Sequence, residues 1–204
     1  MVQQYRATTM ATKGMVTTPH YLASQAALEV LHKGGNAVEA AIAAASTIAV
    51  VYPHMNSIGG DNFWLIYNAK TKEMKALNSS GRAGENATID FYKRKGYEKI
   101  PARGPLATNT VPGAVAGWGE AHQYAAREIG NTLQWQDLLT QAITYAKEGF
   151  PVTESQAYWT EVNLENDQQF RALQRFEEFA RIYLKDGASY KAGEVLRQTD
   201  LGHT

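Results

Sequence analysis

The chain contains 204 residues, of which 20 are Lys or Arg and 20 are Asp or Glu, so its formal net charge is zero. This balance argues against a nucleic-acid-binding protein, which usually carries a basic excess, and against electrostatic binding to an anionic membrane. The hydrophobic fraction of 44% is that of an ordinary globular protein. The absence of cysteine excludes disulfides, thiolate nucleophiles and cysteine-based metal sites within this chain.

No targeting segment is visible at the N-terminus. The run Met1-Val-Gln-Gln-Tyr-Arg6 lacks an apolar stretch behind a basic one, so no signal peptide is predicted. We therefore expect a cytoplasmic protein, or a secreted or periplasmic one if a signal has been removed. The longest apolar stretch, Ala37 to Tyr52, is short for a membrane span and contains Glu39. We interpret this stretch as a buried helix and expect no membrane contact.

The first part of the chain predicts two consecutive helices. Thr18-Pro19 favours a helix start, with a hydroxyl cap followed by proline, and Gly34-Gly35 favours its end. Asn36 and Glu39 have the spacing of a capping box, so a second helix should begin there and end before Pro53. Because this second helix is rich in alanine on nearly every face, we expect it in the middle of the core.

A hairpin and a series of helices follow. The runs 63–67 and 73–77 predict two strands joined by a turn, with Phe63, Trp64 and Tyr67 packed within the sheet. Helices are then expected at 87–94, 114–130, 133–147, from 153–154 onward, and at 176–184. The buried face of the helix at 133–147 should comprise Leu138, Leu139, Ile143 and Ala146. This order indicates an α+β fold in a single domain, 1–204, and argues against a doubly wound parallel sheet.

The common catalytic motifs are missing. The sequence contains no Gly-x-Ser-x-Gly elbow, no Walker A motif, no Gly-x-Gly-x-x-Gly fingerprint and no His-x-x-x-His pair. We therefore expect no metal and no cofactor. Taken residue by residue, the sequence indicates a globular α+β domain with glycine-rich loops.

Three groups of segments carry a more specific signal, and they occur along the chain in a fixed order. They are Gly14–Ser24 with Gly34–Ala41, Val51–His54 with Ser57–Gly60, and Thr110–Gly117 with Ala146–Phe150. Together they closely resemble the large-subunit half of the γ-glutamyltransferase (γ-glutamyltranspeptidase) family, a branch of the N-terminal nucleophile hydrolases. The resemblance covers nearly the whole chain.

The resemblance implies a fold and an activity. The fold would be a four-layer α-β-β-α sandwich shared by two subunits, which arise when a precursor cleaves itself. The nucleophile would be a Thr at the start of the small subunit, outside this chain, so no residue here is expected to be catalytic. Residues 1–204 would then be the N-terminal portion of the large subunit. Its partner would be the small subunit or the rest of the precursor, in a heterodimer or a dimer of heterodimers.

One substrate-binding residue maps from the family onto this sequence. The family places an Arg shortly after the hairpin, where it binds the α-carboxylate of the γ-glutamyl group, and the resemblance puts Arg82 at that position. A guanidinium offers two parallel N–H donors that match a carboxylate. Judged by spacing alone, Arg82 would be a surface residue after a turn. Four residues in the loop before the hairpin could either line the floor of the substrate pocket or form a structural turn. They are Asn56, Ser57, Gly59 and Gly60.

The chain also departs from the family's pattern. Gly81 and Ala83 flank Arg82 where secreted members commonly carry acidic or bulky residues, and the loop 59–62 lacks the family's longer glycine run. Three functions are therefore left open: a γ-glutamyl hydrolase or transferase acting on amides such as glutathione, a glutaryl- or cephalosporin-type acylase, and a non-catalytic homologue that serves as a binding or structural protein.

Overall fold

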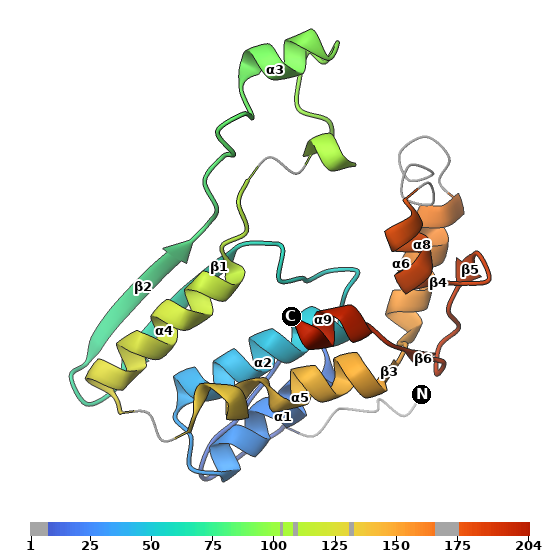
Figure 1. Cartoon of the computed structure of the whole chain (residues 1–204). Coiled ribbons are helices and arrows are strands. Elements are labelled where there is room, and N and C mark those ends of the chain that lie inside the picture. Colours follow the sequence, from blue (N-terminus) through green and yellow to red (C-terminus); the bar gives the residue numbers. More distant parts are fainter. Residues whose placement is uncertain (1–7, 103, 108–109, 131–132, 166–175) are drawn as a thin grey trace, which may run out of the picture.

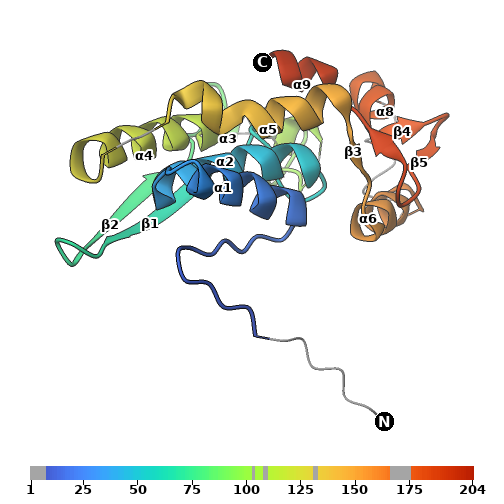
Figure 2. The same cartoon turned by 90° about the horizontal axis from the view of Figure 1, so that it is seen from below.

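The computed structural model describes residues 8–102, 104–107, 110–130, 133–165 and 176–204. Within this part of the chain, helices gather around one central helix, and the strands form three separate two-stranded antiparallel sheets (Figures 1 and 2). The α+β class predicted from the order of the elements is confirmed. No described helix is both long and apolar enough to cross a membrane.

Helix α1 (Tyr21–His32) begins later than the sequence signal indicated. Its N-cap is His20, whose Nδ1 accepts a hydrogen bond from the Leu22 N–H at 3.2 Å. The predicted start at Thr18-Pro19 is wrong because the Thr18 hydroxyl donates to the His20 carbonyl at 2.6 Å, which leaves Pro19 outside the helix. The predicted end is confirmed, since Gly34 has a φ of +90°, a conformation that favours glycine.

Helix α2 (Ala37–Val51) begins with the predicted capping box. Asn36 Oδ1 accepts from the Val38 and Glu39 N–H groups, and Glu39 Oε2 accepts from the Asn36 N–H at 2.7 Å. Glu39 is fully buried, and its other oxygen, Oε1, accepts from the Leu133 N–H at 2.9 Å. This carboxylate therefore caps α2 and also ties it to the segment that leads into helix α5 (Trp135–Glu148).

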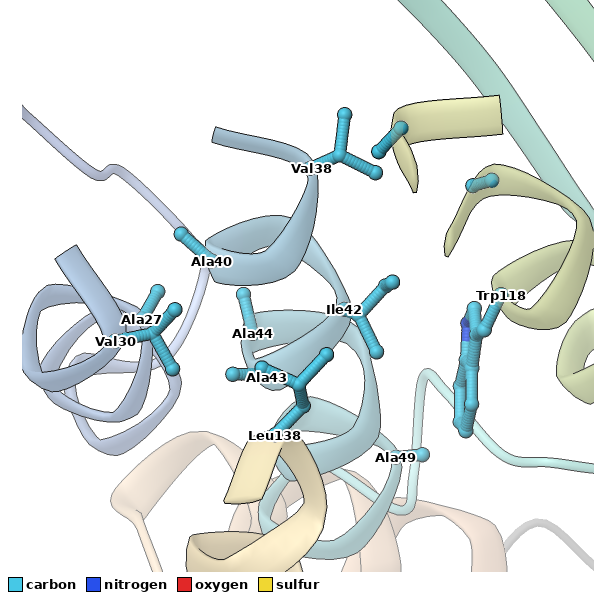
Figure 3. Close-up of a cluster of buried hydrophobic side chains, with 12 residues drawn as sticks. Ala27, Val30, Val38, Ala40, Ile42, Ala43, Ala44, Ala49, Trp118 and Leu138 are labelled. Atoms are coloured by element: carbon cyan, nitrogen blue, oxygen red, sulfur yellow. The ribbon is translucent and has the colours of Figure 1, made fainter. Parts of the chain in front are cut away.

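The core forms around α2, as predicted. Helices α4 (Ala114–Glu128) and α5 (Trp135–Glu148) join α1 in enclosing it. Figure 3 shows Ala27 and Val30 of α1 on one side of α2 and Trp118 of α4 on another. The enclosure is open at the exposed Ala37 and along one half-exposed stripe, which comprises Ala41, Ala45 and Ile48.

The buried face of α5 differs in part from the prediction. Leu138 and Ala146 are buried as expected, and Ala142 joins them between. Ile143 is 39% exposed, so its predicted burial is wrong. The reason is that α5 packs against α2 through a narrow stripe of one residue per turn, which turns Ile143 toward the edge of the contact.

Strands β1 (Asn62–Asn68) and β2 (Glu73–Ser79) form the predicted hairpin, which lies along α4 (Figure 2). Trp64 packs against the helical core, as predicted, whereas Phe63 and Tyr67 are 67% and 57% exposed. Packing of these last two rings within the fold was therefore wrongly predicted. Side chains alternate along a strand, and no described element covers the face on which these two rings lie.

The remaining elements form an arm and a C-terminal region. Helix α3 (Ile89–Arg94) and the short turn η1 (Pro105–Ala107) lie on an arm that projects from the hairpin (Figure 1). The C-terminal region packs beside α5 around the buried residues Phe150 and Leu196. Its elements are β3 (Phe150–Pro151), α6 (Glu154–Glu165), α8 (Glu177–Tyr183), β4 (Leu184–Lys185), β5 (Ala188–Ser189), β6 (Val195–Leu196) and α9 (Thr199–His203).

Candidate functional site

Arg82 lies at the base of the arm, three residues after β2 ends. Its side chain is exposed, and its guanidinium has no hydrogen bond or ion pair with any residue that the structure describes. Its backbone, in contrast, is held in place. The Arg82 carbonyl accepts a hydrogen bond from the Val111 N–H at 2.8 Å, and Ala83 forms a β-bridge with Thr110. The structure thus presents an exposed cationic group on a fixed piece of backbone.

Gly81 explains how the two segments can approach so closely. A Cβ atom at Gly81 would lie 1.6 Å from the Val111 carbonyl oxygen, a distance at which the backbone would have to move. The Gly81 N–H donates to Asp61 Oδ1 at 2.8 Å. The glycine that distinguishes this chain beside Arg82 is therefore required by the close contact of two backbone segments.

The same contact reaches the start of α4. The Gly60 carbonyl accepts from the N–H groups of Gly113 and Ala114 at 3.1 and 2.9 Å. The Ser79 hydroxyl donates to the Gly113 carbonyl at 2.7 Å. Three segments that are distant in sequence therefore meet at one place, and we call it the glycine junction: residues 60–61, 79–82 and 111–114.

The predicted loop residues divide between two places. Gly60 belongs to the glycine junction, close in the fold to the backbone that carries Arg82. Ser57 instead accepts a hydrogen bond from the Gly59 N–H and lines a cavity of about 390 Å³ together with Arg181 and Tyr183 of the C-terminal region. Asn56 is exposed in the same loop, which connects α2 to β1. The structure thus brings Gly60 near Arg82 and gives Ser57 and Gly59 the geometry of a local turn.

Two histidines, the buried His20 and the half-buried His54, lie on either side of Tyr52, away from the junction. The pKa of His54 is lowered by burial, and the pKa of His20 is lowered by burial and by the nearby His54. Tyr52 lies against both rings, and Ser155 lies 3.3 Å from His54 Nε2. Among the described residues, no group of three or more His, Cys, Asp or Glu side chains could hold a metal ion.

Comparisons of the sequence with known proteins point to one family. Residues 23–204 match the family described as Gamma-glutamyltranspeptidase. The chain is 44% identical, over 96% of its length, to the oxamate amidohydrolase proenzyme of Klebsiella pneumoniae, and 48% identical, over 94% of its length, to the glutathione hydrolase-like YwrD proenzyme of Bacillus subtilis. It covers 35% and 34% of these two relatives, so it spans about a third of their length.

Solved structures agree with the sequence comparison. The chain matches the γ-glutamyltranspeptidase of Helicobacter pylori with a TM-score of 0.82 and 27% identity, over 97% of this chain and 54% of that one. It matches the cephalosporin acylase of Bacillus halodurans with a TM-score of 0.76 and 31% identity, over 100% of this chain and 38% of that one. The arrangement of helices and strands is therefore that of one part of these larger proteins.

Proposed function

Because the chain belongs to the γ-glutamyltranspeptidase family, we propose that it is part of an enzyme that cleaves γ-glutamyl amides such as glutathione. The observation that carries this proposal is Arg82, whose guanidinium pairs with none of the described residues and extends from a backbone fixed at the glycine junction. A guanidinium is always protonated and can bind a carboxylate through two parallel hydrogen bonds. The relatives named as glutathione hydrolases, which are 30–33% identical to this chain, support a γ-glutamyl substrate.

The proposed chemistry takes place on a residue outside this sequence. An N-terminal Thr would attack the γ-carbonyl carbon while its own α-amine accepts the hydroxyl proton. The amide bond then breaks, the leaving amine takes up that proton, and the γ-glutamyl group stays on the Thr as an ester. Attack by water completes hydrolysis, and attack by an amine completes transfer. The part of Arg82 is to hold the substrate's α-carboxylate, so that the γ-carbonyl lies at a fixed distance from the nucleophile.

The proposed assembly gives a role to the open side of the hairpin. We infer that residues 1–204 form a single domain, the N-terminal portion of a large subunit, and that the small subunit or the rest of the precursor completes an α-β-β-α sandwich. The outer face of the hairpin carries Phe63, Leu65, Tyr67 and Met74, each more than half exposed. Such a contiguous apolar strip is typical of a surface that another sheet covers.

A second candidate substrate is favoured by the oxamate amidohydrolase, which is 44% identical to this chain. Oxamate is also an amide that carries a carboxylate, so the same guanidinium could bind it. The two substrates differ in the distance between carboxylate and scissile carbonyl. Assays of the full-length enzyme with glutathione and with oxamate separate the candidates, since turnover of oxamate alone would select the second.

The proposal is tested by replacing Arg82 in the full-length enzyme. Arg82→Ala leaves the substrate carboxylate unpaired on binding, a loss of about 2–5 kcal/mol. We therefore expect kcat/KM for γ-glutamyl-p-nitroanilide to fall by about 30-fold to several thousand-fold. Arg82→Lys should recover only part, because a point charge cannot reproduce the planar fork. Self-cleavage of the precursor should be preserved, since it involves no substrate carboxylate.

Two controls show whether the loss of activity is specific to Arg82 and to the substrate carboxylate. Arg127→Ala removes another exposed arginine, on α4, and should leave kcat/KM unchanged. The second control is 4-aminobutyryl-p-nitroanilide, which has the same acyl group without the carboxylate. Equal losses on both anilides in Arg82→Ala would show that Arg82 is structural and would remove the support for γ-glutamyl specificity.

A further inference from the structure

We propose that Asp61 is a positioning residue for Arg82, a role that rests on the proposed function because it requires Arg82 to bind the substrate carboxylate. Asp61 would act through the backbone: its carboxylate holds the Gly81 N–H and thereby fixes the peptide from which the Arg82 side chain extends. Neither the family resemblance nor the sequence pattern assigned Asp61 any part in the site.

The hydrogen bonds around Arg82 form two anchors, one on each side of the residue. Before it, Asp61 Oδ1 accepts from the Gly81 N–H at 2.8 Å. After its Cα, the Arg82 carbonyl accepts from the Val111 N–H at 2.8 Å. Loss of the first anchor would leave the residue held from one side only, next to a glycine, which has the widest conformational freedom of any residue.

Asp61 is suited to this task because its own backbone is held by the start of a long helix. The Gly60 carbonyl, in the residue just before it, accepts from both the Gly113 and Ala114 N–H groups, where α4 begins. The path from α4 through Gly60 and Asp61 to Gly81 therefore connects a rigid element to an exposed loop. A charged acceptor makes the last hydrogen bond of this path stronger than a neutral one would.

Positioning through the backbone predicts a specific pattern of kinetic effects. A guanidinium that is displaced or mobile should weaken only the interactions that involve the substrate carboxylate. Reactions that do not use the carboxylate, including self-cleavage, should be unaffected. A residue that only stabilises the fold would instead lower every activity together with the melting temperature.

The experiment compares Asp61→Ala and Asp61→Asn in the full-length proenzyme. Asp61→Ala should lower kcat/KM for γ-glutamyl-p-nitroanilide by about 5- to 30-fold, which corresponds to about 1–2 kcal/mol. Asp61→Asn retains an Oδ1 acceptor and loses only the charge, so it should lose less than Asp61→Ala and stay within about 3-fold of the wild type. Self-cleavage should proceed at the wild-type rate in both variants.

Asp137→Ala is the matched control. It removes a similar hydrogen bond, in which the carboxylate of an exposed aspartate accepts from the Gln134 N–H at the start of α5, and it should leave kcat/KM unchanged. If Asp61→Asn lowered kcat/KM as much as Asp61→Ala, the proposal would be overturned, because the charge of Asp61 and not its hydrogen bond would then matter. An equal loss of self-cleavage would overturn it as well, by showing a structural role.

Arg82→Ala in the same assays separates this inference from the proposed function. If Arg82→Ala shows no loss specific to the carboxylate substrate, the carboxylate clamp itself fails. If Arg82→Ala shows that loss and Asp61→Ala retains full kcat/KM, only the positioning role of Asp61 is refuted. The double variant Asp61→Ala/Arg82→Ala should be no worse than Arg82→Ala, since Asp61 acts through Arg82.

Discussion

Helix α2 and the β1–β2 hairpin are both rich in apolar residues, but the chain encloses them to different extents. Around α2, neighbours from α1, α4 and α5 bury nearly every side chain (Figure 3). The hairpin is covered on the face of Trp64 alone, and Leu65 on the other face is 77% exposed. The difference shows that the described helices enclose most of α2, whereas the hairpin displays a surface suited to a further layer.

Leu65→Lys should have the largest effect on stability, and it tests whether the exposed face of the hairpin is covered in the full-length protein. If the rest of the full-length protein covers Leu65, the variant buries an unpaired charge, which costs about 3–5 kcal/mol. The melting temperature of the full-length protein should then fall sharply. An unchanged melting temperature would mean that this face stays open to solvent.

Residues 1–204 produced alone should show no γ-glutamyl turnover and a tendency to aggregate, and Leu65→Lys should increase their solubility.

Gly81→Ala tests whether the junction is as tightly packed as the helical core. The added Cβ would meet the Val111 carbonyl oxygen at 1.6 Å, so the backbone must move at a cost of about 3 kcal/mol. Gly119→Ala on α4 is the matched control, because nothing lies within 4 Å of its added Cβ. That variant should be stabilised by about 0.5–1 kcal/mol through higher helix propensity. Thermal unfolding of both variants measures the difference, and equal shifts would contradict the close contact at Gly81.

Two alanines of α2 provide the corresponding test in the core. Ala43 is 2% exposed, and Ala43→Leu should overpack the core at a cost of about 1–3 kcal/mol. Ala41 lies on the half-exposed stripe, where Ala41→Leu has room and should cost less than half as much. Urea unfolding of the full-length protein distinguishes the two. Equal losses would indicate that another part of the protein covers the stripe.

Local signals in the sequence predicted much of the fold. The capping box at Asn36 and the helix stop at Gly34-Gly35 each depend on a few neighbouring residues, and both are confirmed. The start of α1 was mispredicted because the Thr18-Pro19 signal competes with His20, whose imidazole nitrogen can also cap a helix. Patterns of this kind show where an element can begin and leave open which of two adjacent caps is used.

The candidate site depends on contacts between distant residues, which the sequence could not show. Arg82 was identified by its resemblance to a family motif, and Gly81 was noted only as a departure from that motif. The reason for Gly81 lies in Val111, thirty residues away, and the role inferred for Asp61 lies in a hydrogen bond that spans 20 positions. The exposed rings of Phe63 and Tyr67 were missed for a similar reason, because alternation along a strand does not reveal which face will be covered.

The smallest expected effect concerns pH and the N-cap of α1, at the edge of the helical core. Burial and the neighbouring His54 lower the pKa of His20 from its ordinary value of 6.5. Below pH 6.5 the unfolded chain therefore binds a proton at His20 that the folded chain resists, and the stability of the folded state falls as the pH drops. Protonation would also remove the Nδ1 acceptor that caps α1, a loss of about 1 kcal/mol. His54, whose pKa is lowered by burial, contributes with the same sign.

His20→Asn isolates this contribution, because asparagine is a good N-cap and does not titrate. Urea unfolding of the full-length protein at pH 7.5 and at pH 5.5 should show a smaller loss of stability in the variant than in the wild type. His54→Asn should also reduce the loss, since it removes both its own titration and the charge that disfavours protonation of His20. If the stability of His20→Asn depended on pH as much as that of the wild type, the loss of stability at low pH would come from other titrating groups. The cap of α1 would then be insensitive to protonation.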